Sequence, residues 1–429
     1  MVKSTDILGM NARQQQYCAL NSSQSKSFCS SKYATKILLQ HNAIATAKIH
    51  GILTSIEDIN EFEWQTLEKN FVIKPTDGNA GKGVVIFRSR NEKDGTWLET
   101  TGDIWTLDAI KLHCFDILDG QYSTYGSNHN IIIEERIPIH PVFVKYAYKG
   151  TPDVRIIVFN QVPVMAMLRL PTAESEGRAN LHQGAIGVGI DIATGITTKG
   201  ITGNGVPINT LAEGKRKLNG IKIPQWKKAL QVAVEAAQVA GLMFSGVDLF
   251  ISEADGPLIV ELNANPGLSI QLANGAGLRR RLERVRDLQV LNPEHGVKIG
   301  QALFAESFAD KIKAEDGLLI VPPRTQVYVY ENEVTKKRHE TEALLNTGRF
   351  RSAISRALAE DLHLINTNDL LWFQTEKDES KAPVVEVYFR LKERKVKTAM
   401  VVLKRLDKSP YKVEIGRNDL SGFLVGENQ

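Results

Sequence analysis

The stretch VIKPTDGNAGKGV (residues 72–84) places a lysine at the end of an apolar run, directly before a turn with three glycines. The flanking apolar residues predict one strand at Phe71–Lys74 and a second at Val84–Arg88. Glycines let backbone amides approach a polyphosphate closely, and Lys74 would add a fixed cation. The stretch therefore predicts a phosphate-binding strand and a lid at Gly78–Gly83, although an ordinary flexible hairpin explains such a turn alone equally well.

A second hairpin carries two carboxylates and an amide. It joins GVDLF (Gly246–Phe250) to VELNANPG (Val260–Gly267). Glu261 and Asn263 are two residues apart on a strand, so their side chains share a face, and the turn can bring Asp248 alongside them. Hard oxygen donors of this kind suit magnesium that bridges nucleotide phosphates. Exposed acids on a strand edge are the alternative, but paired acids in an apolar hairpin are costly without a cation.

The remaining patterns outline the domains. Further strands are expected at Ile131–Glu135, Val154–Phe159 and Val164–Leu170, and helices at Tyr33–Leu39, Ile56–Leu67, Ile221–Leu242 and Leu278–Asp310. Residues 1–31 are rich in Ser, Gln and Asn, which predicts a flexible leader. We expect a first domain at 32–310 with a small lid subdomain at about 68–135, a linker at 311–326, and a mostly β domain at 327–429. In this last domain, strands are expected at Val327–Tyr330, Val384–Leu391, Val396–Leu403, Lys412–Ile415 and Phe423–Val425.

Composition excludes several classes of protein. The 53 basic and 49 acidic residues nearly balance, so the chain lacks the strongly basic character of a nucleic-acid-binding protein. Its three cysteines are too few and too scattered for a disulfide framework or a zinc knuckle. We find no signal segment and no apolar run near the ~20 residues that span a bilayer. A soluble, cytoplasmic protein is expected.

In combination, these motifs resemble a known family. A lysine at a helix start, the strand lysine, the glycine lid, a Glu-Glu pair, Asp…Glu-x-Asn and Pro-Gly occur here in the order found in ATP-grasp carboxylate–amine ligases. The closer resemblance is to the α-L-glutamate ligase homolog group, related to ligases that add glutamate to a ribosomal protein. It is carried by IEERIPIHPVF (133–143), PDVRIIVFNQVPVMAMLRLPT (152–172), GRANLHQGAIGVGID (177–191) and ELNANPGLSIQLANGAGL (261–278). The fold it implies is the α/β (α+β) ATP-grasp fold.

The resemblance also implies roles for single residues. The ATP phosphates would be held by Lys32 and Lys74 under a lid that contains Gly78, Gly81, Lys82 and Gly83. The adenine pocket would be lined, partly through the backbone, by Glu134, Glu135 and Ile137. Magnesium, with two ions expected and manganese as an alternative, would be bound by Asp248, Glu261 and Asn263. The substrate carboxylate and the acyl-phosphate would meet Arg155 and Arg169, and the reaction centre would be lined by Asn180 and His182 beside Arg178. A histidine in such a loop is equally well explained as an ordinary hydrogen-bonded residue.

The implied reaction is phosphoryl transfer from ATP to a carboxylate, followed by attack of an amine on the acyl-phosphate. Glutamate, another amino acid or a peptide is the expected substrate, with a protein as an alternative. One departure leaves the substrate open: about thirty residues precede Lys32, where such ligases carry a whole domain. Either the substrate site is open, or a partner completes it. The rival hypothesis is a non-enzymatic module that binds nucleotide and peptide.

The C-terminal domain resembles a second family. ALLNTGRFRSAISRALAEDLHL (Ala343–Leu364) and VEIGRNDLSGFLV (Val413–Val425) are similar to retropepsin-like domains called bacterial "ATP-dependent zinc proteases". In that fold an Asp-Thr-Gly turn supplies the catalytic aspartate, and two subunits form the dyad. Here Asn346 occupies this position, and an amide cannot share the proton on which the dyad depends. His339 and His363 form no zinc set. We therefore expect an inactive β domain for homodimerisation or for holding a peptide.

Overall fold

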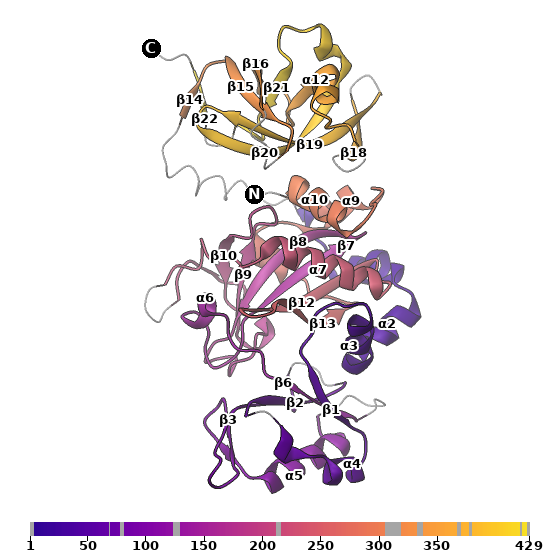
Figure 1. Cartoon of the computed structure of the whole chain (residues 1–429), viewed down its shortest axis with the longest axis vertical. Coiled ribbons are helices and arrows are strands. Elements are labelled where there is room, and N and C mark those ends of the chain that lie inside the picture. The colour runs from indigo at the N-terminus through magenta and orange to yellow at the C-terminus, as the bar shows by residue number, and fades with distance from the viewer. Residues whose placement is uncertain are drawn as a thin grey trace. The chain divides into compact units, whose positions relative to one another are not determined.

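The computed structural model describes residues 4–67, 69–77, 81–122, 129–211, 216–304, 319–332, 338–366, 370–376, 380–420 and 423–426 (Figure 1). It divides into two compact units: Met1–Asp191 with Gly195–Arg286, and Ile192–Thr194 with Asp287–Gln429. Helix α10 (Pro293–Phe304) thus falls in the second unit, whereas the sequence assigns it to the first domain. Residues 311–318 of the expected linker lie outside the described residues. None of the described helices is long and apolar enough to cross a membrane.

The smaller sheet of the first unit forms the lid subdomain. Its strands, in spatial order, are β1 (Ile49–Leu53), β6 (Ile131–Glu135), β2 (Phe71–Pro75), β3 (Val85–Arg90), β4 (Trp97–Glu99) and β5 (Ile104–Trp105). Helices α4 (Ile56–Glu61) and α5 (Leu107–Leu118) pack on it around a core of buried aromatic and branched side chains (Figure 1). The helix expected at Ile56–Leu67 is shorter because Phe62 adopts an extended backbone, and a 3₁₀ turn, η4 (Trp64–Thr66), follows it.

The larger sheet of the first unit is wholly antiparallel. Its strands, in spatial order, are β11 (Pro207–Ile208), β10 (Thr197–Ile201), β9 (Ile186–Ile190), β8 (Val162–Leu170), β7 (Asp153–Phe159), β12 (Phe244–Ser252) and β13 (Gly256–Asn263). Helix α7 (Trp226–Val239) packs on it through buried alanine, leucine and valine side chains. This helix begins later than expected because Ile223 bonds to Gly195 and Lys222 pairs with Ile196, which keeps that segment extended. The unit also contains α3 (Lys32–His41), α6 (Pro141–Val144), α8 (Ile270–Asn274) and α9 (Leu278–Val285).

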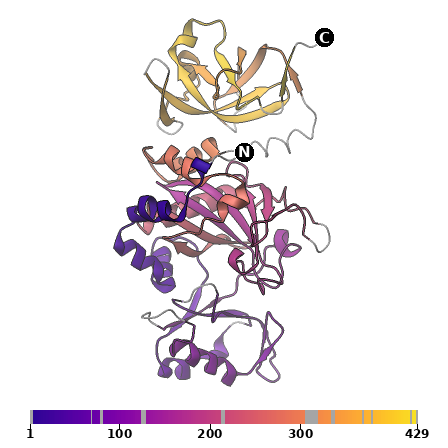
Figure 2. The same cartoon turned by 180° about the vertical axis from the view of Figure 1, so that it is seen from behind.

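The N-terminal segment differs from the expected flexible leader. It forms η1 (Ser4–Asp6), α1 (Met10–Ala12), η2 (Arg13–Tyr17), η3 (Cys18–Leu20) and α2 (Ser23–Ser30) along the first unit (Figure 2). Tyr17 is fully buried, with its ring centroid 5.5 Å from that of Phe159 and 5.8 Å from that of Phe244. The Asn21 side chain bonds to both the backbone N–H and the carbonyl of Phe244. A few well-placed side chains therefore anchor a segment that is polar on average.

The second unit contains a closed β-barrel. In order around the sheet, its strands are β15 (Arg324–Tyr330), β16 (Arg338–Asn346), β21 (Val413–Gly416), β17 (Ala353–Ser355), β20 (Arg394–Leu403), β19 (Lys381–Leu391) and β18 (Leu370–Thr375). Strand β15 also pairs with β19, which closes the ring and leaves β18 at its side. The unit also contains a parallel pair, β14 (Leu319–Val321) with β22 (Phe423–Val425), as well as helix α12 (Arg356–Asp361) and the 3₁₀ helix η7 (Lys404–Lys408). The prediction of a mostly β C-terminal domain is confirmed.

Candidate active site

A cavity of about 750 Å³ lies in the first unit, and residues of both its sheets line it. It collects nine residues that the sequence nominates: Lys32, Gly81, Arg155, Arg169, Asn180, His182, Asp248, Glu261 and Asn263. These residues come from segments more than 200 positions apart, and the strand order of the larger sheet brings Arg155, Asp248 and Glu261 together.

The register of the larger sheet puts the nominated metal ligands on one face. Asp248 lies directly opposite Glu261, and Gly246 lies opposite Asn263. On its other side, Asp248 lies opposite Arg155 of β7. Directly paired residues project to the same side of a sheet. The predicted adjacency of the two acids and the amide is therefore present.

Three buried charges and one partly buried charge form what we call the acid–arginine cluster: Arg169, Asp153 and Asp248 are buried, and Arg155 is partly buried. The guanidinium of Arg155 donates from Nε to Asp248 Oδ1 at 2.7 Å and from Nη2 to Oδ2 at 2.6 Å. Arg169 donates to both oxygens of Asp153 at 2.5 Å and also to Asp248 Oδ2 at 2.7 Å. Sequence reasoning missed Asp153, because nothing in the one-dimensional pattern shows that β8 faces it with an arginine.

The two acids of this cluster differ in their pKa. Burial, reinforced by the charge of Asp248, raises the pKa of Asp153 to about 6, although Arg169 opposes the shift. Burial also disfavours the ionised form of Asp248, but Arg155 and Arg169 outweigh it and hold its pKa below the ordinary value. Asp248 is therefore ionised at neutral pH, as a ligand for a cation must be.

The donor set fits a hard divalent cation. It consists of two carboxylates and an amide on one face, and the buried Asn263 Nδ2 has no hydrogen-bond partner in the structure. Amide nitrogen and oxygen are assigned by their contacts, so this unsatisfied end of Asn263 marks a place for a further ligand. Among the described residues, no three His, Cys, Asp or Glu side chains converge as a complete metal site.

Three further charges form what we call the lysine triad: Lys36, Lys74 and Glu134. The Lys74 ammonium lies 2.6 Å from Glu134 Oε1, and the Lys36 ammonium lies 2.6 Å from Oε2. All three side chains are more than nine-tenths buried. Lys36 was not nominated from the sequence, although it follows Lys32 by one helical turn on α3 and so shares its face.

Lys32 lies near this triad and also lines the cavity. Its ammonium donates to the carbonyl of Thr76 at 3.4 Å. Burial lowers its pKa, while the charge of Glu261 opposes the shift. Lys32 is thus placed between the strand lysine and the nominated metal ligands.

The glycine-rich lid is held by aromatic side chains. Gly83 has φ +72°, and a Cβ there would lie 2.7 Å from the ring of Tyr122. The Gly83 carbonyl contacts His113 Nε2 at 3.1 Å, and burial lowers the pKa of His113. Gly81 has φ +73° and lies against the Arg178 side chain. Lys82 is exposed, and Gly78 lies outside the described residues.

The other nominated residues lie as follows. Glu135 Oε1 accepts a hydrogen bond from the backbone N–H of Lys48, and Ile137 is buried against Phe250, which lines the cavity. Both oxygens of Glu134 contact lysines, and its strand β6 lies between β1 and β2. The Asn180 side chain accepts a hydrogen bond from the backbone N–H of His182 and so caps the 3₁₀ turn η5 (Leu181–Gln183).

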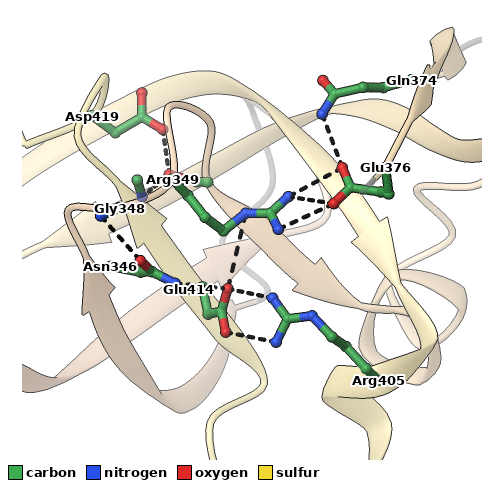
Figure 3. A network of polar contacts seen from close by, with 10 residues as sticks. Asn346, Gly348, Arg349, Gln374, Glu376, Arg405, Glu414 and Asp419 are labelled. Atoms are coloured by element: carbon green, nitrogen blue, oxygen red, sulfur yellow. Dashed lines mark hydrogen bonds and ion pairs between the residues drawn. The ribbon is translucent and has the colours of Figure 1, made fainter. Parts of the chain in front are cut away.

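In the second unit, Asn346 ends strand β16 inside a network of charges (Figure 3). Its Oδ1 accepts from the backbone N–H of Gly348 at 3.2 Å, and its Nδ2 lies 3.4 Å from Glu414 Oε2. Glu414 is paired with both terminal nitrogens of Arg405, at 2.9 and 2.7 Å, and Arg349 pairs with Glu376. A carboxylate thus lies next to the Asn346 amide, and arginine holds it.

Comparison with known families gives one match over most of the chain. Residues 11–287 match the family model described as "Sugar-transfer associated ATP-grasp". The matched span includes both sheets of the first unit, every nominated site residue and most of the N-terminal segment. The second unit lies almost wholly outside it.

Curated relatives carry ligase names. A "Probable alpha-L-glutamate ligase" of Thioalkalivibrio sulfidiphilus is 27% identical over 54% of this chain and 56% of its own length. A "Ribosomal protein bS6--L-glutamate ligase" of Salmonella paratyphi B is 25% identical over 59% of this chain and 61% of its own. The chain thus matches little more than half the length of these relatives. A solved D-alanine–D-alanine ligase of Bacillus anthracis is 15% identical over 69% of this chain and 71% of its own, with a TM-score of 0.34.

Proposed function

Because the chain belongs to the sugar-transfer associated ATP-grasp family, we propose that it joins a carboxylate to an amine at the expense of ATP. This membership confirms the ATP-grasp module that the sequence predicts. The observation that carries the proposal is the single cavity that gathers Lys32, the lid glycine Gly81, two arginines, and the acids and amide of the β12–β13 hairpin. Each is suited to one part of the same phosphoryl transfer.

In this proposal Lys32 and Lys74 hold the phosphates, and the lid closes over them. Magnesium, which neutralises developing charge on the phosphates when bound, would be held by Asp248, Glu261 and Asn263. The proposal includes two bound metal ions, and magnesium is preferred to manganese.

Arg155 and Arg169 would bind the substrate carboxylate that accepts the phosphoryl group. Arg155 and Arg169 are fixed by carboxylates, so their free N–H groups point in set directions. Preorganised donors of this kind stabilise the charge on an acyl-phosphate without reorganising during the reaction. In the first step a carboxylate oxygen of the substrate bonds to the γ-phosphorus, while the bond from this phosphorus to the β–γ bridging oxygen breaks and ADP leaves. Attack by the amine then releases phosphate and leaves an amide.

We propose an amino acid or peptide as the substrate, with a protein as an alternative, and the cytosol as the setting. The names of the relatives support glutamate as the amino acid to be tried first. A solved relative is described in complex with a precursor peptide, which supports including peptides in the trial.

The second unit is proposed to be a retropepsin-like domain without protease activity. Its closed barrel and the Asn-Thr-Gly turn at the end of β16 support the likeness. The loss of activity follows from Asn346 and from Glu414, whose pKa is held below its ordinary value by Arg405 and Arg349 against the effect of burial. A role in homodimerisation or peptide binding is part of this proposal.

The direct test is mass spectrometry of products after incubation with ATP, magnesium and pooled amino acids, peptides or cell extract, with release of ADP followed in parallel. An adduct whose mass equals the sum of two components minus water supports the ligase. ATP binding without turnover over a broad panel would favour the rival hypothesis of a binding module. Asp248→Asn provides a further test of the two hypotheses, because a ligase should lose ligation activity in this variant while adenosine binding is retained.

A further inference from the structure

The lysine triad carries an excess charge. Two ammoniums, Lys36 and Lys74, share the single carboxylate of Glu134, which gives a formal charge of +1 in a group that is more than nine-tenths buried. Burial lowers the pKa of Lys36, with the charge of Lys74 acting in the same direction and Glu134 opposing it. Net charge away from water is unfavourable without a counter-ion, so this arrangement is suited to an anion that arrives later.

The triad is also rigidly placed. Lys74 and Glu134 lie on the adjacent strands β2 and β6, and Lys36 reaches them from α3. Lys36 donates in addition to the carbonyl of Ala47 at 3.3 Å, which fixes its ammonium on the far oxygen of Glu134. If Lys36 were neutral, the pair of Lys74 and Glu134 would carry no net charge.

We propose that Lys36 is a positioning residue of the nucleotide site. Because Lys36 shares the Glu134 carboxylate with Lys74, the triad keeps a net positive charge for the nucleotide phosphates. The inference rests on the proposed function, because it presumes that ATP binds at Lys74. It assigns to Lys36 an effect through Glu134 and Lys74 rather than a contact with the nucleotide. The alternative is a structural ion pair that only ties α3 to the sheet.

Two single variants and their double variant distinguish a positioning role of Lys36 from a purely structural ion pair. The triad has a formal charge of +1 in the native chain, zero in Lys36→Met, +2 in Glu134→Gln and +1 again in the double variant. We expect Lys36→Met to weaken ATP binding about 10-fold, as for one charge removed at a partly buried site. The double variant should recover to within about threefold of the native value, and Glu134→Gln alone should bind ATP no more weakly than the native chain.

Titration calorimetry of the full chain with ATP and with adenosine provides the measurement. Adenosine carries no phosphate, so its affinity should be the same in the native chain and in Lys36→Met. Lys111→Met, which removes a partly exposed lysine on α5, is the matched control and should leave both affinities unchanged. Lys36→Gln makes the same charge change and replaces the methionine variant if that one does not fold.

Three outcomes would overturn the inference while leaving the ligase proposal intact. In the first, Lys36→Met binds ATP as the native chain does. In the second, the double variant is as weak as Lys36→Met, which a structural pair predicts because both variants lose the contact to α3. In the third, adenosine affinity falls along with that of ATP. A native chain that binds no ATP would instead overturn the proposed function and this inference together.

Discussion

Placing an acid at the turn of the second unit, by Asn346→Asp, should destabilise the barrel in a pH-dependent manner. In the native chain the Asn346 amide faces Glu414, with Nδ2 3.4 Å from Oε2 (Figure 3). The substitution replaces this donor with an oxygen that carries negative charge. Glu414 is only 5% exposed, so water screens the new contact weakly.

The expected magnitude follows from this geometry. Two unit charges about 4 Å apart repel by about 4 kcal/mol at an effective dielectric constant of about 20. Arg405 already neutralises much of the charge of Glu414, and Asn346 is partly exposed, so we expect about half of this value. The lost hydrogen bond adds about 1 kcal/mol. The free energy of unfolding should therefore fall by about 3 kcal/mol at pH 8.

The pH dependence has a definite sign. Against the effect of burial, Arg405 holds the pKa of Glu414 below its ordinary value, so Glu414 is ionised near neutral pH. An aspartate that faces this charge has a folded-state pKa above its unfolded value of about 3.9. The repulsion is therefore absent below the unfolded pKa and complete above the folded one. Asn346→Ala, which loses the same bonds without adding charge, should show a constant deficit of about 1 kcal/mol.

Hydrogen exchange of the full chain, read by mass spectrometry on peptides from β16 and β21, reports this local stability. Rates are corrected for the intrinsic effect of pH and compared for the native chain and both variants between pH 4 and 8. The expected result is that the aspartate and alanine variants differ by about 0.5 kcal/mol or less at pH 4 and by about 2 kcal/mol at pH 8. Equal protection of the two variants throughout this range would refute the electrostatic argument.

Three further predictions concern the first unit. Gly83→Ala should weaken ATP binding and destabilise the lid by about 2–4 kcal/mol, because the new side chain meets both a positive φ and a tyrosine ring. Gly95 has a positive φ but open space around it, so Gly95→Ala should lower stability by only about 1 kcal/mol, as measured by thermal unfolding. Asn21→Ala removes three hydrogen bonds, two of them buried, and should lower the free energy of unfolding by about 2–3 kcal/mol, with hydrogen exchange rising at the start of β12. Burial raises the pKa of Cys114 to about 12 and that of Cys29 to about 11, so iodoacetamide at pH 8 should leave both thiols unmodified unless denaturant is added. Rapid labelling of the folded chain would show that the burial is incomplete.

The sequence correctly predicted the two hairpins whose residue pattern lies within a short stretch of chain. The β12–β13 hairpin was recoverable because alternating apolar residues flank a short Gly-containing turn, and spacing along one strand placed Glu261 and Asn263 on one face. The lid hairpin was recoverable because glycine is the residue that tolerates the positive φ found at Gly81 and Gly83.

Other features depend on contacts between distant segments, and no local pattern encodes them. Residues 4–30 are polar on average, yet Tyr17 and Asn21 anchor this segment to residues more than 140 positions away. Asp153 meets Arg169 only because β7 and β8 pair in that register. The contact of Lys36 with Glu134 could not be predicted either, although the helical spacing of Lys36 from Lys32 would have nominated Lys36 as a site residue.

The acid–arginine cluster and the lysine triad differ in a way that bears on the proposed reaction. The cluster contains two positive and two negative groups, so it is neutral by itself, while the triad has one positive charge in excess. A cation held by Asp248 would compete with the arginines for its oxygens. Because Arg169 has a second carboxylate in Asp153, it keeps a bidentate partner if its contact with Asp248 loosens. Asp153 thereby lets Asp248 serve a cation without leaving Arg169 unpaired, and the uncompensated charge of the triad remains for the phosphates.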